Sequence, residues 1–322
     1  MFFLGADIGG TKTAVVIANE SGEILTVQKG IGSNYQSCGK ENSFTVLNEL
    51  VEKACGKAQI QKKDLDHAYF GVAGADLDYD FVVIKTILDQ LQIEHHSFEN
   101  DGLIALRSGT EKGTGILVTC GTGSISYGYN KQKIMRKGGF SSFFGERLGG
   151  YYVAGMIASA IIRGEDGRGP KTIMHELLKK QYSVTIQEMM KTEYPDQEYI
   201  GPDVHIALIS TLYRAAHQHD RAALGILCDI SKEVQTIVNA FRMEMTFELP
   251  LNLVLEGSVF KYADPILYKM IKTAVGDDYN LVLPDHDPVI GAVLFAMEKA
   301  GHKITTDIYR QLITTYVKYT NA

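Results

Sequence analysis

Short apolar runs alternate with segments of helical periodicity through the first part of the chain. Apolar runs beginning at Phe2 and at Ala14 flank a turn with paired glycines, and this pattern predicts two antiparallel strands. After them, predicted strands and helices alternate, which is typical of a largely parallel sheet. The predicted elements are a strand at 23–27, a polar loop at 30–37, a helix capped by Ser43, a strand at 68–72, a helix with Phe81, Ile84, Leu88 and Leu91 on one face, and a strand at 94–98.

The strand–turn–strand pattern of the N-terminus is repeated from Gly113. A strand at 116–119 leads into the loop Cys120-Gly121-Thr122-Gly123-Ser124, after which an alternating segment at 125–129 predicts a hairpin. An internal repeat of this kind predicts two domains of related design. We therefore expect a first domain formed by 1–111 together with a C-terminal helix at about 304–322, and a larger second domain at 112–303.

Beyond Gly149 the apolar residues recur at helical spacing, so the second domain is expected to carry a helical insertion. Pro265 and Pro288 each stand where a later helix begins, a position that proline favours. The predicted helices span 149–163, 171–181, 185–193, 203–217 and 220–243, with breaks at 164–170 and 194–202; the later elements are strands at 251–255 and 279–283, helices from Pro265 and Pro288, and a last helix at 305–319.

Composition narrows the class of protein. The chain has 322 residues and a net charge of −6, and no basic block is longer than 61–63, which argues against nucleic acid as the main partner. Its four cysteines, Cys38, Cys55, Cys120 and Cys228, are widely spaced, so neither a zinc site nor a disulfide framework is implied. Because the sequence has no basic leader and no apolar run of membrane-spanning length, we expect a cytoplasmic protein that does not bind membranes.

Glycine-rich or acidic loops, at 7–13, 100–101, 121–124 and 257–259, follow four of the predicted strands. Glycine allows a backbone to approach a ligand closely, and a row of backbone N–H groups forms an anion-binding concavity. The first loop lacks the spacing of a Walker A loop and leads into a strand, which also excludes a dinucleotide fingerprint. An ordinary Gly-Gly hairpin is the alternative for this loop alone. Together with the loop at 121–124, it predicts a site that holds a triphosphate.

Two carboxylates in these loops have the chemistry that phosphoryl transfer needs. Asp7 is suited to organise Mg²⁺ through its water shell, since magnesium is usually held by one or two carboxylates together with phosphate oxygens. Asp101 is suited to accept a proton from an attacking hydroxyl group. Taken singly, an aspartate at a strand end is most often a turn or cap residue, so the prediction depends on the four loops together.

Two histidine-containing segments, His95-His96 and Asp285-His286-Asp287, have the residue types of metal ligands. Adjacent residues on a strand point to opposite faces, and a metal site needs several convergent ligands. We therefore expect no shared metal in either segment.

Several motifs resemble those of the actin and sugar kinase superfamily and, within it, the N-acetylglucosamine kinase and BadF/BadG/BcrA ATPase family. The segment 7–13 resembles the phosphate 1 motif, 120–124 the phosphate 2 motif and 255–259 the adenosine motif. Further matching segments are 138–140, 145–146, 151–152, 166–172 and 288–292, and the resemblance extends from Asp7 to about Ala296. It implies an α/β fold with two ribonuclease H-like (actin-like) domains, a central cleft for ATP and a sugar, and a homodimer.

The resemblance also implies an activity: ATP-dependent transfer of the γ-phosphate to the 6-hydroxyl of an N-acetylated amino sugar, N-acetylglucosamine or N-acetylmuramic acid, with Mg²⁺ at Asp7 and Asp101 as the base. The implied ATP-binding residues are Gly9, Gly10, Thr11, Lys12, Thr13, Gly121, Thr122, Gly123, Ser124, Gly257 and Ser258, and the implied sugar-binding residues are Asn34, Asn100, Asp101, Gly139, Glu146 and Arg147. One alternative is an ATPase that activates a dehydratase, which would need cysteines placed to share an iron–sulfur cluster. Another is a sugar-sensing protein without catalysis.

One segment departs from the family pattern. Where the family usually has Gly-Asp-Glu-Gly-Ser, this chain has Gly145-Glu146-Arg147-Leu148-Gly149, so an acid is lengthened and the next acid becomes a cation. We hypothesise that Arg147 favours an anionic sugar such as N-acetylmuramic acid, because a guanidinium group binds a carboxylate through two parallel hydrogen bonds. The alternative is that Arg147 points to solvent or pairs with a nearby acid.

Overall fold

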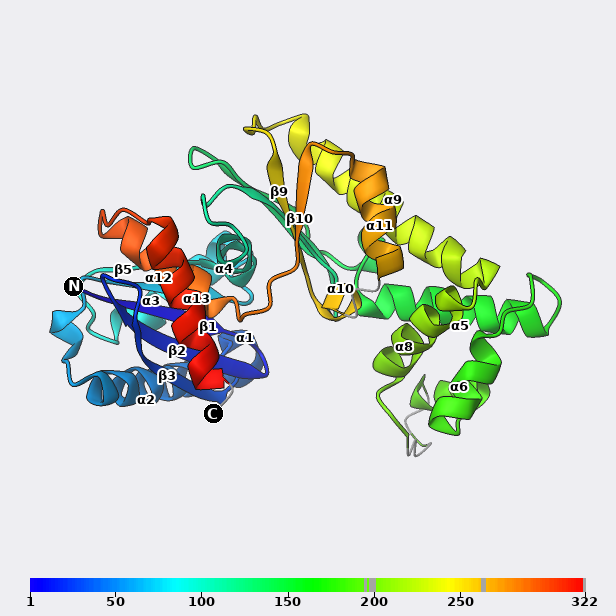
Figure 1. Cartoon of the computed structure of the whole chain (residues 1–322). Helices are drawn as coiled ribbons and strands as arrows, with labels where there is room; N and C mark the ends of the chain where they lie inside the picture. Colours follow the sequence, from blue (N-terminus) through cyan, green and yellow to red (C-terminus); the bar gives the residue numbers. More distant parts are fainter. Residues whose placement is uncertain (194–195, 197–200, 262–264, 321–322) are drawn as a thin grey trace. The chain divides into compact units, whose positions relative to one another are not determined.

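A computed structural model of the chain describes residues 1–193, 196, 201–261 and 265–320, and it divides into two compact units (Figure 1). Unit 1 comprises Met1–Leu117 and Pro284–Ala322, and unit 2 comprises Val118–Leu283. The sequence-based boundaries placed 284–303 in the second domain. In the structure this segment belongs to unit 1, because helix α12 (Val289–Lys299) packs against strands β1 and β4 of that unit.

Unit 1 is built on a five-stranded mixed sheet in the order β3-β2-β1-β4-β5. The first three strands are antiparallel, while β1, β4 and β5 run parallel. Residues of β1 alternate between the two faces, and because both faces are covered the strand is apolar nearly throughout. The strands are β1 (Phe2–Ile8), β2 (Lys12–Asn19), β3 (Ile24–Ile31), β4 (His67–Val72) and β5 (His96–Asn100).

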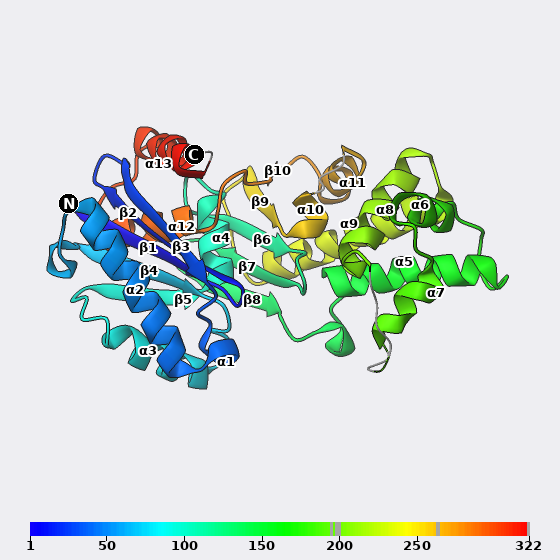
Figure 2. The same cartoon turned by 90° about the horizontal axis from the view of Figure 1, so that it is seen from below.

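Helices cover both faces of this sheet. Figure 2 shows α2 and α3 below the sheet and α12 and α13 above it. On the α12 face a Cβ added to Gly5 would lie 2.5 Å from the backbone nitrogen of Val293, so only glycine permits this close packing. The helices are α1 (Tyr35–Cys38), α2 (Lys40–Ala58), η1 (Lys62–Asp64), α3 (Asp78–Asp89), α4 (Asp101–Ser108), α12 and α13 (Thr306–Thr320).

Three details of unit 1 differ from the sequence predictions. The segment expected to be a polar loop contains the short helix α1, and α2 begins earlier, with Gly39 rather than Ser43 as its N-cap. Ser43 lies inside α2, where its hydroxyl donates to the carbonyl of Ser33 at 2.7 Å. Strand β5 ends at Asn100 instead of residue 98, and α4 follows it without an intervening loop.

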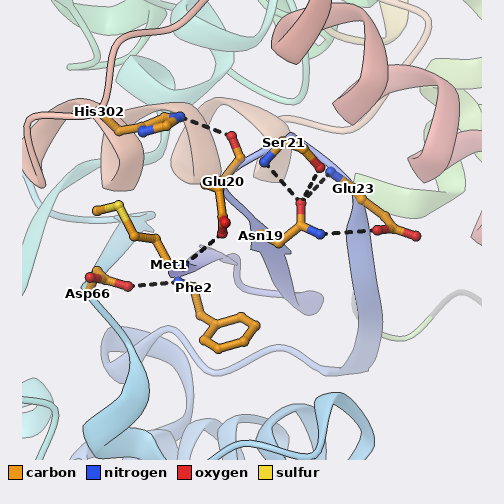
Figure 3. A network of polar contacts seen from close by, with 8 residues as sticks. All are labelled: Met1, Phe2, Asn19, Glu20, Ser21, Glu23, Asp66 and His302. Atoms are coloured by element: carbon orange, nitrogen blue, oxygen red, sulfur yellow. Dashed lines mark hydrogen bonds and ion pairs between the residues drawn. The ribbon is translucent and has the colours of Figure 1, made fainter.

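Polar contacts fix the edge of unit 1 where the chain begins (Figure 3). The terminal ammonium group of Met1 donates to Oε2 of Glu20 at 2.7 Å, and the carbonyl of Glu20 accepts from Nε2 of His302 at 2.9 Å. The backbone N–H of Phe2 donates to Oδ2 of Asp66 at 2.8 Å. These contacts lie at the opposite end of β1 from the glycine turn that follows Ile8. They stabilise the sheet and do not involve that turn.

Unit 2 has a second five-stranded sheet, in the order β10-β9-β6-β7-β8. The two mixed sheets with their helices confirm the predicted α/β class. Most of the predicted helical insertion is present, and Asp203 and Asp220 cap α8 and α9 with their side chains. The elements are β6 (Gly115–Thr119), β7 (Ile125–Tyr129), β8 (Ile134–Gly138), η2 (Ser142–Phe144), α5 (Gly150–Glu165), α6 (Met174–Tyr182), α7 (Ile186–Met189), η3 (Met190–Glu193), α8 (Val204–His217), α9 (Arg221–Arg242), β9 (Leu251–Glu256), α10 (Ser258–Lys261), α11 (Pro265–Val275) and β10 (Tyr279–Val282).

The predicted break at 194–202 falls mostly outside the described residues. Within the parts of the chain that the structure describes, no helix is both long and apolar enough to cross a membrane.

Candidate functional site

The turn between β1 and β2 is held by a second loop of unit 1. The N–H of Gly9 closes the turn on the carbonyl of Lys12 at 3.0 Å, and the carbonyl of Gly9 accepts from the N–H groups of Ser33 and Asn34 at 3.1 and 3.2 Å. A Cβ added to Gly32 would lie 2.1 Å from the carbonyl oxygen of Gly10. The loop after β3 is therefore packed directly against the glycine turn, which it keeps in one conformation.

The exposed side of this turn has the chemistry of an anion site. Gly10, Thr11 and Lys12 are exposed, and among the described residues no protein acceptor is found for the N–H groups of Gly10 and Thr11. Such backbone donors suit phosphate oxygens. The side chain of Thr13, which is also expected to bind ATP, is fully buried, and its hydroxyl pairs with that of Ser33 at 2.7 Å. This side chain holds the two loops together.

Asp7 lies near the end of β1, one residue before the strand ends, and is only partly buried. No group of three or more metal-ligating side chains is found in the described parts of the chain. Magnesium does not require such a group, because Mg²⁺ needs few protein carboxylates when phosphate oxygens and water complete its coordination. The single carboxylate of Asp7 near the glycine turn fits that donor set.

Asn34 lies on the loop that supports the glycine turn, but its side chain is already engaged. Its Oδ1 caps α1 by accepting from the N–H of Gln36 at 2.9 Å. Gln36 in turn donates to the carbonyl of Gly74 at 3.2 Å and to Oδ1 of Asp80 at 3.0 Å, while the hydroxyl of Tyr35 also bonds to Asp80. The sugar-binding candidate Asn34 is thus fixed to the loop that follows β4.

Asp101 begins α4 directly after β5, and strand register places it at the same edge of the sheet as the glycine turn. Ile8 is aligned with Val72, and Val72 with Asn100, across the parallel strands β1, β4 and β5. Adjacent strands lie about 4.8 Å apart, so Ile8 and Asn100, on strands separated by β4, lie about 10 Å from each other. The structure therefore brings together, in unit 1, the predicted phosphate loop and the predicted base.

The surroundings of Asp101 change its acidity. Burial raises the pKa of the Asp101 carboxyl group to about 6, and the nearby carboxylate of Asp76 contributes in the same direction. Hydrogen bonding to the N–H of Gly102 opposes this shift. A carboxylate with such a pKa is ionised at neutral pH and is a stronger base than an ordinary aspartate, as proton abstraction requires.

In unit 2, the loop between β6 and β7 is enclosed by two other glycine segments. The N–H of Cys120 donates to the carbonyl of Glu256 at 2.7 Å, and the N–H of Gly150 donates to the carbonyl of Gly121 at 2.6 Å. Gly257, with φ of 107°, leaves no room for a Cβ, which would lie 2.4 Å from the carbonyl carbon of Cys120. The predicted phosphate and adenosine loops of this unit are thus in contact.

The tip of this loop is open to ligand. Thr122 and Gly123 are exposed, and a Cβ built on Gly121 or Gly123 would meet no atom within 4 Å. Ser124 is different: it is buried, and its hydroxyl donates to the carbonyl of Thr119 at 2.9 Å. The N–H of Gly121 is already donated to the carbonyl of Gly123 at 3.1 Å, so the backbone N–H groups of Thr122 and Gly123 are the ones suited to phosphate oxygens.

A pocket of about 260 Å³ in unit 2 joins this loop to the segment that departs from the family pattern. Its lining combines two aromatic rings, two serine hydroxyls, two cations and two acids. The residues are Ser124, Ser126, Lys137, Gly138, Phe140, Phe144, Gly145, Glu146, Arg147, Leu148, Glu233 and Ile237. Gly139, which was expected to bind sugar, is the neighbour of two lining residues but does not line the pocket itself.

Glu146 and Arg147 have separate partners in this pocket. The carboxylate of Glu146 accepts from the backbone N–H of Phe140 and so closes the segment 140–146 into a loop. Burial raises the pKa of Glu233 on α9, whereas the nearby guanidinium group of Arg147 lowers it, which places the two charges close together. Arg147 is exposed and lines the same pocket as Glu233.

The two histidine-containing segments do not converge on a common point. Nδ1 of His96 contacts the carbonyl of Ile93 at 3.0 Å. Nε2 of His286 contacts the carbonyl of Ser108 at 3.0 Å, whereas Asp287 faces Lys12 and Lys29.

Two acids beside the candidate site, Asp76 and Asp287, were not among the predicted site residues. The only signal for Asp76 was the acidic loop that follows the strand at 68–72.

Comparisons with known proteins found a matching family, similar sequences and a solved structure with the same fold. The model of the BadF/BadG/BcrA/BcrD ATPase family matches residues 4–296. An N-acetyl-D-glucosamine kinase from Dictyostelium discoideum is 26% identical over 311 residues, 92% of this chain and 97% of the relative. An N-acetylmuramic acid/N-acetylglucosamine kinase from Clostridium acetobutylicum is 36% identical over 176 residues, 54% of this chain and 57% of the relative. A ROK family glucokinase from Streptomyces griseus, solved with glucose and AMPPNP, shares the fold, with a TM-score of 0.57 and 15% identity over 92% of this chain and 100% of that one.

Proposed function

Because the chain belongs to the BadF/BadG/BcrA/BcrD ATPase family, we propose that it is an ATP-dependent kinase that phosphorylates the 6-hydroxyl group of an N-acetylated amino sugar. The observation that carries this proposal is Asp101, a partly buried carboxylate with a raised pKa, placed two strands away from an exposed glycine turn. The names of the relatives from Dictyostelium discoideum and Clostridium acetobutylicum supply the acceptor class.

In this proposal each group has one task. Bound ATP with Mg²⁺ supplies the γ-phosphoryl group, whose phosphorus bonds to the sugar oxygen as its bond to the bridging oxygen of ADP breaks. Asp101 accepts the proton of the 6-hydroxyl at its carboxylate oxygen. The N–H groups at 10–11 and 122–123 and the Lys12 ammonium group would bind phosphate oxygens, and Asp7 would orient the magnesium water shell.

The acceptor is proposed to lie against the unit 2 pocket. Aromatic faces beside hydroxyls and charged groups suit a sugar, which has apolar C–H faces and polar edges. Arg147 and Lys137 line the same pocket, and both suit a carboxylate on the sugar. N-Acetylmuramic acid, which carries a lactyl carboxylate, is accordingly proposed as an acceptor alongside N-acetylglucosamine.

An assay of sugar-dependent ADP release over a panel of sugars tests the proposal. The panel contains N-acetylglucosamine, N-acetylmuramic acid, glucosamine and glucose, and the phosphorylated position is read by NMR. Phosphorylation at the 6-position of an N-acetylated sugar is expected. Turnover of glucose alone, or ATP hydrolysis that no sugar stimulates, would contradict the proposal. Sedimentation of the purified protein separately tests the homodimer that family resemblance implies.

A further inference from the structure

Lys12, on the exposed glycine turn, faces a carboxylate from a distant part of unit 1. Its Nζ lies 3.8 Å from Oδ1 of Asp287, the residue before Pro288, which caps α12. The Lys12 side chain is 64% exposed and that of Asp287 29%, so the ammonium group is the more accessible partner. The contact is the longest of the three that Asp287 makes with the side chains described here.

The other two contacts are made by the second carboxylate oxygen of Asp287, Oδ2. Nζ of Lys29 lies 3.2 Å from its Oδ2, and the hydroxyl of Tyr316 donates to the same oxygen at 2.5 Å. Burial raises the pKa of Asp287, but these hydrogen bonds and the two ammonium groups hold it below its usual range. Asp287 is therefore a fixed anion, whereas Lys12 is the partner that is able to move.

Strand register explains why these charges gather at the phosphate site. Asp7 is paired with Ala14, and Ala14 with Lys29, so the three side chains form a row across one face of the sheet. Lys12, two residues before Ala14, lies on the same face. Tyr316 is buried against this face, and its pKa is raised by burial, by Asp287 and by Asp7. Tyr316 is thus close to both Asp287, the partner of Lys12, and Asp7, the carboxylate proposed for magnesium.

We propose that Asp287 is the counter-ion of Lys12 in the nucleotide-free protein and that it competes with nucleotide phosphates for this ammonium group. The inference rests on the proposed function, in which Lys12 binds phosphate. When phosphates take Lys12, the pair opens and Asp287 keeps Lys29 and Tyr316. The carboxylate therefore weakens nucleotide binding and favours release of ADP.

The test is the affinity of the full-length protein for ADP and for a non-hydrolysable ATP analogue with Mg²⁺, measured by calorimetry. Asp287→Asn keeps the shape of the side chain and an acceptor for Tyr316 but removes the charge. It is expected to bind both nucleotides about two- to five-fold more tightly, the range of a partly exposed ion pair, with a smaller gain at high salt. Damage to the fold would weaken binding, so the direction separates the two effects.

Two further measurements keep the proposal open to refutation. In a Lys12→Met background, Asp287→Asn is expected to give no gain, because the competition acts through Lys12. A gain of the same size there would show general charge repulsion and overturn the proposal, as would unchanged or weaker binding by Asp287→Asn alone. If Asp287→Asn does not fold, Tyr316→Phe serves: Asp287 then has one fewer partner and holds Lys12 more firmly, so binding is expected to weaken about two-fold.

Tyr319→Phe is the matched control for Tyr316→Phe. Tyr319 also lies on α13 and donates a single hydrogen bond, at 2.8 Å to the carbonyl of Leu25, outside the charge cluster. Loss of this hydroxyl group is expected to leave nucleotide affinity unchanged, and an equal loss of affinity in both variants would overturn the proposal.

If the wild-type protein bound neither nucleotide, the proposed kinase function itself would fail. Binding by the wild type without a gain in Asp287→Asn would remove only the present inference.

Discussion

The side-chain amide of Asn100 donates to Oδ1 of Asp76 at 3.0 Å. The same Asn100 caps α4 through its Oδ1, which accepts from the N–H of Gly102 at 2.9 Å. One side chain therefore joins the loop after β4 to the first turn of α4 and fixes Asp101 between them. Two carboxylates, Asp76 and Asp101, are kept near each other as a result, and three predictions follow from that arrangement.

Replacing Asp101 with Asn is expected to lower kcat by about 10²- to 10⁴-fold, because the amide cannot accept the hydroxyl proton. The measurement is sugar-dependent ADP release at saturating substrates. Affinity for the ATP analogue should stay within about two-fold of the wild type, since the change lies outside the glycine loops. Turnover near the wild-type level would remove Asp101 from its proposed role.

The pH profile of kcat/KM is expected to fall below pH 6. The pKa of Asp101 is raised to about 6, and only the ionised form accepts a proton, so activity declines as pH drops through that value. In Asp76→Asn, which retains an acceptor for Asn100 but not the charge, the acidic limb should move to lower pH by less than about one unit, because burial is the larger cause. An acidic limb near pH 4 in the wild type would contradict the raised pKa.

Asp101 is also expected to lower the free energy of unfolding at neutral pH. Its folded pKa, about 6, lies above the value near 4 of an unfolded chain, so its contribution favours folding below about pH 4 and is lost as pH rises through 6. Asp101→Asn is therefore expected to be more stable than the wild type by about 1–2 kcal/mol at pH 7.5, with no gain at pH 4. Urea denaturation at the two pH values checks this, and a gain independent of pH would indicate another cause.

Arg147→Ala is expected to lower kcat/KM for N-acetylmuramic acid about ten-fold and to leave N-acetylglucosamine within about two-fold, if the guanidinium group binds the sugar carboxylate. Glu233→Gln is the companion variant, because it removes the acid beside Arg147 and should improve use of the anionic sugar. Equal use of both sugars by the wild type and by Arg147→Ala would show that Arg147 does not select the acceptor.

Gly32→Ala is expected to destabilise unit 1 by about 1–3 kcal/mol and to weaken nucleotide binding at least ten-fold, because its methyl group would displace the Gly10 carbonyl. Gly56→Ala is the control: Gly56 lies inside α2, is exposed, and a Cβ there meets no atom within 4 Å. That change should stabilise the protein by up to about 1 kcal/mol. Thermal denaturation and analogue binding of the two variants decide the matter, and a harmless Gly32→Ala would refute the packing argument.

Local pattern predicted most elements whose apolar residues alternate or recur at helical spacing. The strand at Ala14–Ala18 and the helices that follow Asp203 and Asp220 are examples, since each has a clear period or a capping aspartate. Helix α4 was missed because residues 102–108 are all buried, so no polar face reveals its period. The cap at Ser43 was wrong because the tertiary bond to Ser33 engages its hydroxyl.

Parts of the candidate site were predictable where one loop contains all the residues concerned. They were not predictable where the interacting residues are far apart in the sequence. The glycines at 9–10, 121 and 123 and the pair Asn100-Asp101 are recognisable by residue type. Asp287 does not, because it is 258 residues from Lys29 and its role depends on the packing of α12 and α13. The contact of the Thr13 side chain with Ser33 was not predictable for the same reason, because the two residues are brought together only by the fold.

Unit 1 is made from two separated stretches of chain, and this has a consequence for synthesis. While the ribosome makes residues 118–283, for about ten to thirty seconds at ordinary elongation rates, β1 has no α12 to cover the face that carries Phe3 and Gly5. Unit 2, which is continuous, is able to fold first. We expect the nascent N-terminal segment to remain sensitive to protease until α12 emerges. The contact between Lys12 of the glycine turn and Asp287 would therefore be among the last to form.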